Sequence, residues 1–190
     1  IYPAMKAARL DPVKALSYRI GPGLIFERLW RESGIQAVII RHSEERGFGF
    51  SVERALFLSV LHRLLVSGSD RFCDRWRRDY RIEGSGDLQL HHLYRAMGWL
   101  GEPLSPEEPS SDRGVRYIKD LIEESLFTRN RDLFSSLDLV FFDTTSLYFE
   151  GAGGERLGQF GHSKDHRPDL RQMVVGAVLD NTGRPISCEM

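Results

Sequence analysis

Apolar and polar residues recur at helical spacing over the first part of the chain. The predicted helices cover about residues 24–32, 51–66, 69–81, 89–100 and 112–127, and the fourth begins at Asp87 or Gln89. Ser51 and Ser69 each precede an apolar run and are expected to cap a helix, and Ser67-Gly68 ends the helix that Ser51 starts. The sequence therefore predicts a helical N-terminal region.

Three sets of side chains within these helices have an expected place. The predicted buried stripe of the second helix consists of Val52, Ala55, Leu56, Ser59, Val60 and Leu64. In the third helix, Phe72, Trp76 and Tyr80 repeat every four residues, which favours a core position over a base-stacking platform. His91 and His92 are expected to be structural histidines.

The pattern changes to that of strands from about residue 137. The runs LDLVFFD, TSLYFE, QMVVGAVLD and RPISCEM are rich in β-branched and aromatic residues, and Asn181-Thr182-Gly183 forms a turn between the last two. Helices come first and strands second, which predicts an α+β protein whose sheet domain is incomplete. The expected regions are 1–20, a basic tail; 21–136, helical; and 137–190, the start of the sheet domain. The segment GEPLSPEEPSSD is a predicted linker.

Composition narrows the class of protein. Hydrophobic residues make up 41%, charged residues 28%, and the formal net charge is -1, which disfavours disordered and membrane proteins. No apolar stretch reaches the 18 or so residues that a membrane span needs. Cys73 and Cys188 lie far apart without a metal-binding pattern, which fits a reducing compartment and predicts a cytoplasmic protein.

Asp143 is the first candidate for chemistry, because it directly follows the apolar run LDLVFF. A carboxylate at the end of a buried strand is costly unless it is paired or binds a metal, and Mg²⁺ commonly takes one or two such groups. The alternative is an Asp that caps a turn or helix. Glu150 lies seven residues on, which places it on the opposite face of an unbroken strand, so only a bulge or turn would bring the two together.

Two basic clusters are candidates for nucleic-acid contact. In the loop GQFGHSKDHRPDLRQ, Lys164, Arg167 and Arg171 are predicted to contact a phosphate backbone near the acid, while Gly161 and Pro168 argue against a helical zinc pair of His162 and His166. In the third helix, Arg71, Arg75 and Arg78 follow a stripe of their own. They are predicted to bind DNA, with a surface of weak ion pairs to neighbouring aspartates as the alternative.

Several sequence motifs resemble those of known families. The segment YPAMKAARLDPVKALSY is similar to the cytoplasmic end of the FtsX-like permeases of ABC exporters, which indicates a fused tail. The alternatives are a basic amphipathic leader and an exporter C-terminus with an unrelated extension. From Gly21 on, the chain resembles bacterial insertion-sequence transposases of the DDE class, in the superfamily named for insertion sequence four. The motifs that carry this resemblance include SVERALFLSVLHRLLVSGS, FDTTSLYFEG, GHSKDHRPDLRQMVVGAVLD and GRPISCEM.

That resemblance implies an RNase H-like catalytic domain in which three acids bind two Mg²⁺ or Mn²⁺ ions and cleave and join DNA at transposon ends. Asp143 matches the first acid, and the second Asp and final Glu are expected beyond Met190, so the chain alone is expected to be inactive. The implied partners are DNA, as terminal inverted repeats and target, with a homodimer left open and no membrane. The alternative is a non-catalytic DNA-binding or interaction module.

Overall fold

The structure is a computed structural model and describes residues 19–104, 115–131, 140–150, 158–161 and 166–189. The chain divides into two compact units between Ile122 and Glu123, here called the helical unit and the sheet unit. Several predictions lie outside the described residues: most of the basic tail, most of the linker, the boundary at residue 136, and Lys164.

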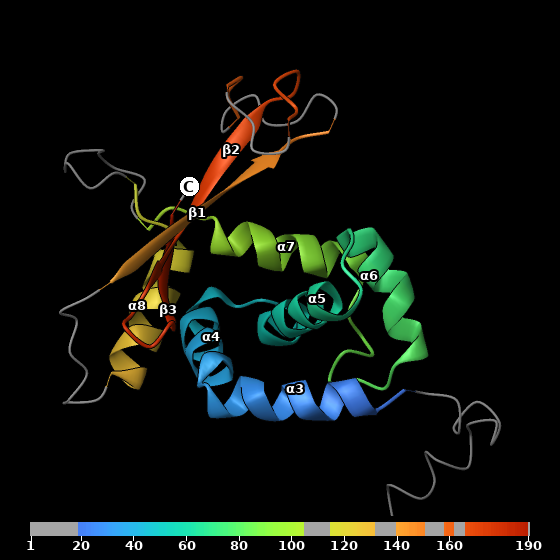
Figure 1. Cartoon of the computed structure of the whole chain (residues 1–190). Coiled ribbons are helices and arrows are strands. Elements are labelled where there is room, and N and C mark those ends of the chain that lie inside the picture. Colours follow the sequence, from blue (N-terminus) through green and yellow to red (C-terminus); the bar gives the residue numbers. More distant parts are fainter. Residues whose placement is uncertain (1–18, 105–114, 132–139, 151–157, 162–165, 190) are drawn as a thin grey trace, which may run out of the picture. The chain divides into compact units, whose positions relative to one another are not determined.

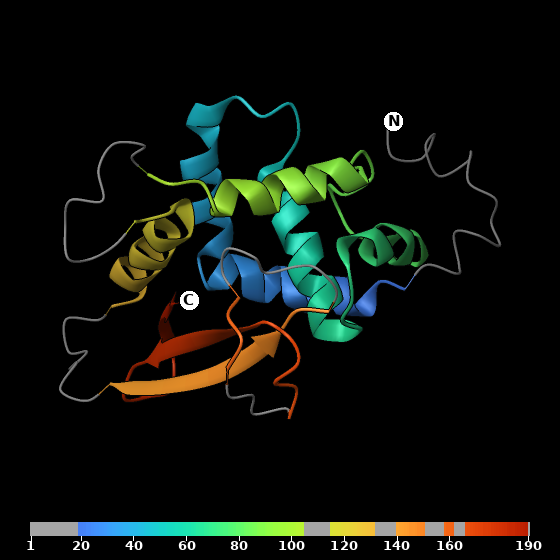
Figure 2. The ribbon, with the colours of Figure 1, turned by 90° about the horizontal axis from the view of Figure 1, so that it is seen from above.

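The helical unit is built around one central helix. Its helices are α3 (Gly21–Glu32), α4 (Ile35–Ser43), α5 (Val52–Leu65), α6 (Asp70–Trp76) and α7 (Leu90–Leu100), with short 3-10 turns at Glu44–Arg46 and Arg77–Asp79. Helix α5 packs against α3, α4, α6 and α7, as Figures 1 and 2 show. The last helix, α8 (Ile118–Asn130), contains the boundary between the two units.

The helix boundaries follow from local capping. The Ser51 hydroxyl accepts a hydrogen bond from Arg54 N (3.2 Å), and the Ser69 hydroxyl accepts one from Phe72 N (3.3 Å), so both predicted caps are confirmed. Of the two predicted starts of α7, Asp87 and Gln89, the structure has Gln89 as the cap. Helix α4 was not predicted. Gly34, with φ of 81°, turns the chain sharply between α3 and α4 in the left-handed region that favours glycine.

The predicted buried stripe of α5 is partly wrong. Val60 and Leu64 are 39% and 61% exposed, whereas Phe57, Leu58 and Leu61 are buried. The one-sided pattern fails because α5 has neighbours on several sides, so most of its circumference lies in the core.

The aromatic stripe of the third helix is buried only in part. Trp76 is buried and Tyr80 packs on it (4.2 Å between ring centroids), but Phe72 is 38% exposed. The α-helix ends at Trp76 instead of Arg81, and the tighter 3-10 turn that follows changes the direction of the later side chains. The expected core position is therefore confirmed for Trp76, whereas Phe72, within the same α-helix, is exposed.

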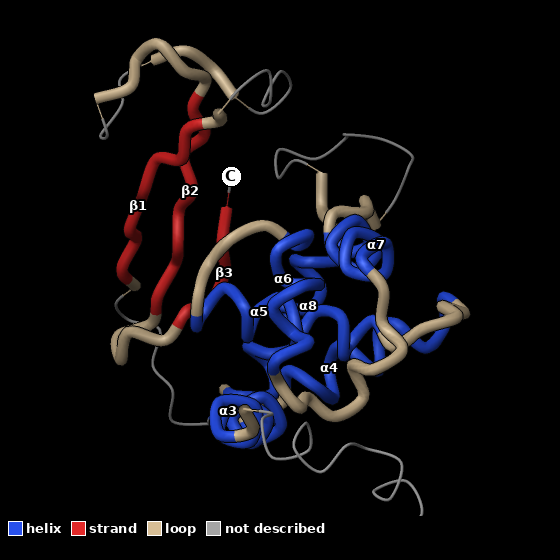
Figure 3. Tube along the Cα trace, turned by 90° about the vertical axis from the view of Figure 1, so that its right-hand side faces the viewer, coloured by secondary structure: helices blue, strands red, loops and turns tan. Residues whose placement is uncertain are grey.

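The sheet unit contains a three-stranded antiparallel sheet. Its strands are β1 (Phe141–Tyr148), β2 (Gln172–Leu179) and β3 (Pro185–Glu189), and β2 lies between the other two (Figure 3). The runs LDLVFFD and TSLYFE contribute one strand in place of two, because β1 pairs with β2 without interruption from Phe141 to Tyr148. The predicted turn is confirmed: the Asp180 carboxylate accepts hydrogen bonds from Thr182 N (2.8 Å) and Arg184 N (2.9 Å).

Helices followed by a small antiparallel sheet place the chain in the α+β class, as predicted. Both faces of the sheet carry exposed apolar side chains: Phe141 and Leu147 on one face, and Phe142 and Val174 on the other. A sheet that is apolar on both faces is typical of layered domains in which further elements cover each face.

Candidate functional site

Asp143 is the third residue of β1, opposite Ala177 of β2. The sequence predicted a carboxylate at the end of a buried strand, but the strand continues for five residues to Tyr148 and the Asp143 side chain is exposed. Thr144, Thr145, Leu147 and Tyr148 favour extended backbone and pair with QMVVGAVL, which explains why the strand does not stop at the acid. Among the described residues, no side chain forms an ion pair with Asp143.

Glu150 does not meet Asp143. The register of β1 and β2 is unbroken, and Phe149 N still donates to Arg171 O (2.9 Å), so no bulge bends the chain between the two acids. With a rise of about 3.4 Å per residue, Asp143 lies roughly 17 Å from Tyr148 at the end of β1, and Glu150 follows two residues after that end.

The described residues do not fit a two-metal site. No group of three or more His, Cys, Asp or Glu that could hold a metal ion occurs in the described part of the chain. A two-metal site clamps ions about 3.5–4 Å apart between several carboxylates, and Asp143 alone cannot supply that arrangement. We therefore derive no catalytic step from the implied Mg²⁺ or Mn²⁺ ions.

The basic loop before β2 is attached to the end of the sheet by Gln172. This side chain is buried, and its Nε2 donates to Gly161 O (3.0 Å) and Arg167 O (3.4 Å). Its backbone also exchanges hydrogen bonds with Gln159 (2.8 and 2.9 Å). One sequence signal marks this role, a polar residue at the start of an otherwise apolar strand.

The loop arginines lie against aromatic rings. The Arg167 guanidinium lies 5.5 Å from the Tyr148 ring centroid and pairs with both carboxylate oxygens of Asp169 (3.0 Å each), which raises the pKa of Arg167 and lowers that of Asp169. Arg171 lies 5.4 Å from the Phe160 ring centroid. Tyr148 is five residues from Asp143 along β1, so this end of the sheet is roughly 17 Å from the acid.

The predicted DNA-binding arginines of the third helix are exposed. We call Arg71, Arg75 and Arg78 the α6 arginine surface. Arg75 lies over the exposed Phe72 ring (5.8 Å), and Arg78 makes only a long contact with Asp74 (3.4 Å). All three guanidinium groups are therefore accessible to a ligand.

Arg77 differs from these three, because it faces inward. It donates to Asp74 (3.1 Å), to Ser85 O (2.8 Å) and to Leu88 O (2.6 Å). These bonds hold the segment between α6 and α7, so Arg77 has a structural role. By residue type alone, Arg77 does not differ from the exposed arginines beside it in the sequence.

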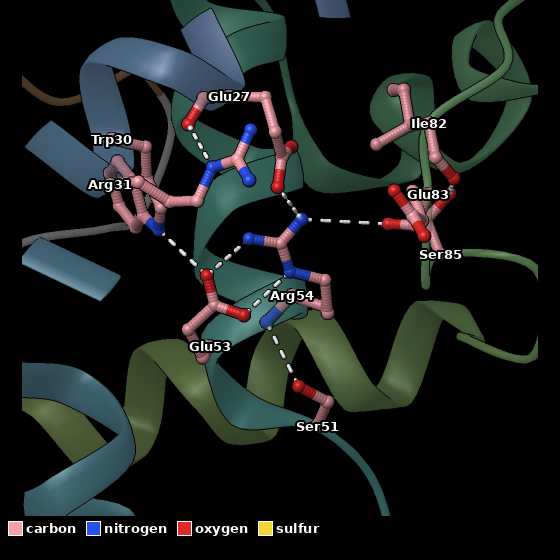
Figure 4. Close-up of polar contacts among 9 residues, drawn as sticks. All are labelled: Glu27, Trp30, Arg31, Ser51, Glu53, Arg54, Ile82, Glu83 and Ser85. Carbon is pink, nitrogen blue, oxygen red and sulfur yellow. Dashed lines mark hydrogen bonds and ion pairs between the residues drawn. The ribbon is translucent and has the colours of Figure 1, made fainter. Parts of the chain in front are cut away.

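A buried ionic cluster lies between α3 and α5 (Figure 4). Arg54 donates to both oxygens of Glu53 and to Glu27 (2.6 Å), and the indole of Trp30 donates to Glu53 (2.7 Å). Burial disfavours the charged guanidinium, but the bonds to Glu53 and Glu27 outweigh it and raise the pKa of Arg54. Because each of these charges has a protein partner, the cluster connects helices and offers no free group for chemistry.

An apolar groove of about 350 Å³ lies between α3 and α5. Leu29, Trp30, Val60 and Leu64 line it, and the only charged side chain among its lining residues is Glu32. A single carboxylate without a nearby base, nucleophile or metal ligand gives this groove no catalytic constellation.

Comparison with protein families, with curated proteins and with solved structures finds no match to this chain. In the part of the chain that the structure describes, no helix is both long and apolar enough to cross a membrane. The functional conclusion therefore depends on three features above: Asp143 on the sheet, the loop arginines at the sheet end, and the α6 arginine surface.

Proposed function

We propose that this chain is part of a DDE transposase, with a helical unit that binds DNA and a sheet unit that carries the first metal-binding acid. The sheet unit would then be the beginning of an RNase H-like domain. The proposal concerns the role of the chain within the transposition enzyme, because one acid does not perform the cleavage.

The position of Asp143 is the observation that carries this proposal. On its face of β1 and β2 it is the one charged residue, surrounded by Phe141, Thr145, Leu147, Met173, Val175, Ala177 and Leu179. Asp143 is exposed here, but if further elements of the whole enzyme cover this apolar face, a carboxylate in it is costly unless a cation or hydrogen-bond donors compensate its charge. A cation-binding role accounts for an acid in this place, whereas a turn cap does not, because Asp143 lies within a strand.

The contact between two sequence motifs gives further support to this proposal. Two of the motifs that resemble transposases, DTTSLYFE and GHSKDHRPDLRQ, lie apart in the sequence. Tyr148 of the first motif pairs with Gln172 at the end of the second motif. Arg167 of the second motif lies over the Tyr148 ring. The described parts of the two motifs thus contact each other, as expected if a single function requires both.

The non-catalytic module remains the second candidate, and the α6 arginine surface favours it. Three exposed arginines, Arg71 and Arg75 on α6 and Arg78 on the 3-10 turn that follows it, can contact phosphates without any chemistry. Both candidates share DNA binding and differ in whether the remaining acids exist. The coding sequence after Met190 distinguishes them: a strand with an Asp and a helix with a Glu support the enzyme, and an immediate stop codon supports the module.

Charge reversal tests the shared function. The triple variant Arg71→Glu, Arg75→Glu and Arg78→Glu is compared with the wild-type chain in a gel mobility shift with a random duplex. The control variant Arg28→Glu, Arg31→Glu and Arg41→Glu changes the net charge equally on exposed arginines of α3 and α4. We expect the first variant to lose the shift and the control to keep most of it. Equal loss in both, or loss in neither, contradicts a specific role for the α6 arginine surface.

A further inference from the structure

Helix α7 presents a face with cationic and aromatic side chains but no acid. Its sequence, LHHLYRAMGWL, contains no Asp or Glu. Leu93, Ala96 and Trp99 are buried against the helical unit, which leaves the opposite side of the helix exposed. The α7 face consists of His91, Tyr94, Arg95 and Gly98, which are neighbours at three- and four-residue spacing.

Arg95 lies against two aromatic rings. Its guanidinium lies 5.2 Å from the Phe50 ring centroid and 5.7 Å from that of Phe48. No carboxylate among the described residues forms an ion pair with it. Contact with ring faces orients the guanidinium while its N–H groups stay available to an anion.

The neighbouring rings are also fixed. Phe50 stacks on His92 with centroids 4.3 Å apart and an angle of 14°, and Gln89 N donates to His92 Nδ1 (3.0 Å). The support for Arg95 is therefore rigid, since a backbone hydrogen bond orients the imidazole on which Phe50 lies. Pre-ordered groups of this kind lose little entropy when a ligand binds.

Between Tyr94 and Arg95 the α7 face has a flat floor, formed by Gly98, which has no side chain. Gly98 lies one turn further along α7, and a Cβ atom at this position would meet no other atom within 4 Å. Packing does not require glycine here, and glycine costs helix stability, so its presence fits a close approach of something outside the chain. Tyr94 is 52% exposed and offers a ring face beside this floor.

We propose that the α7 face binds an unpaired nucleobase together with its phosphate, with Tyr94 stacking on the base over Gly98 and Arg95 binding the phosphate. A surface that combines exposed aromatic rings with arginine suits single-stranded nucleic acid, because only an unpaired base exposes its ring face. The inference rests on the proposed DNA-binding function and adds a single-stranded substrate to the duplex assigned to the α6 arginine surface.

Three labelled oligonucleotides of 15 nucleotides test this by fluorescence anisotropy: oligo(dT), an abasic strand of the same length, and a duplex. The variants are Tyr94→Ala, Arg95→Gln and Gly98→Gln, with Met97→Ala as the control, since Met97 is exposed on α7 outside the face. Circular dichroism verifies that each variant keeps its helices. Gly98→Gln favours helix and so tests the floor without weakening the fold.

Oligo(dT) should bind roughly 10-fold weaker to Tyr94→Ala than to the wild type, the scale of one lost stacking contact. Gly98→Gln and Arg95→Gln should also bind oligo(dT) more weakly than the wild type, whereas Met97→Ala should bind it equally well. With the abasic strand, Tyr94→Ala should have the same affinity as the wild type. Equal wild-type affinity for oligo(dT) and the abasic strand, or unchanged binding by Tyr94→Ala and Gly98→Gln, overturns the inference. If duplex binding still depends on the α6 arginine surface in that case, the proposed function stands; if it does not, both fail.

Discussion

The guanidinium of Arg54 lies against the carboxylate of Glu53, its neighbour in sequence, with Nε donating to Oε2 at 2.5 Å. Both side chains are largely buried, at 10% and 5% exposure. Gly84, on the opposite side, leaves space for Arg54, because a Cβ atom there would lie 2.9 Å from Arg54 Cδ. The charged pair is therefore enclosed by α3, α5 and the segment after α6.

Removal of Arg54 should strongly destabilise the helical unit. In Arg54→Leu the carboxylates of Glu53 and Glu27 stay buried without a cation, and loss of one partner of a buried ion pair costs about 3–5 kcal/mol. Chemical denaturation followed by circular dichroism measures the loss. The control is Arg28→Leu, which breaks an exposed ion pair with Glu32 on α3 and should leave the midpoint unchanged. Similar midpoints for the two variants would show that the buried cluster contributes little.

Acid should weaken the helical unit through His62. The side chain is fully buried between the rings of Phe72 and Trp76 (5.4 and 5.2 Å), and neither ring nitrogen has a hydrogen-bond partner among the described residues. Burial and then Arg63 lower its pKa, and Asp70 opposes them.

The sign of the pH effect follows from that direction. The unfolded chain binds a proton at His62 below about pH 6.5, whereas the folded chain resists it, so stability falls as the pH drops through this range. We expect the denaturation midpoint to fall between pH 7.5 and 5.5, and to fall less in His62→Leu. An unchanged pH dependence in His62→Leu would contradict the assignment.

The sheet depends on a contact between Phe142 and Gly176. A Cβ atom at position 176 would lie 2.5 Å from the Phe142 ring, which therefore covers the glycine directly. Gly176→Ala should destabilise the sheet unit, and Phe142→Ala should relieve the clash, so the double variant should lose less than the sum of the single losses. Thermal unfolding of the four proteins measures this coupling. Additive losses would mean that ring and glycine do not interact.

Local signals made part of this fold predictable. Ser51, Ser69 and Gln89 form caps within three residues of sequence, so the chain itself contains the whole interaction. The turn at Asp180 is local in the same sense. Burial on α5 was predicted less well, because the exposure of Val60 and Leu64 depends on how four other helices pack around it.

The candidate site was less predictable than the fold. Residue type marked Asp143 and the exposed arginines, but the inward position of Arg77 depends on the carbonyl groups of Ser85 and Leu88, which only the folded chain brings close. The bond from Gln172 to Gly161 likewise joins a strand residue to a loop residue 11 positions away in sequence. Long-range partners of this kind leave no periodic trace in a sequence.

The chain alone should not cleave DNA. Among the described residues no group of three or more potential metal ligands occurs, and Asp143 by itself cannot hold a two-metal clamp. Incubation of a supercoiled plasmid with the purified chain and Mg²⁺ or Mn²⁺ should leave it intact, with a metal-dependent nuclease as the positive control. Metal-dependent cleavage that disappears in Asp143→Asn would contradict this, whereas cleavage that persists would identify a contaminant.

The salt dependence of duplex binding tests the central claim, that the helical unit binds DNA through phosphate contacts of the α6 arginine surface. Anisotropy titrations over a range of salt concentrations give the slope of log K against log salt. Neutralisation of Arg71, Arg75 and Arg78 to Gln should make the slope less negative by about 2.7, since each lost phosphate contact removes about 0.9. The same change at Arg28, Arg31 and Arg41 should leave the slope unaltered. No duplex binding at low salt, or an identical slope for the wild type and the α6 variant, would contradict the account.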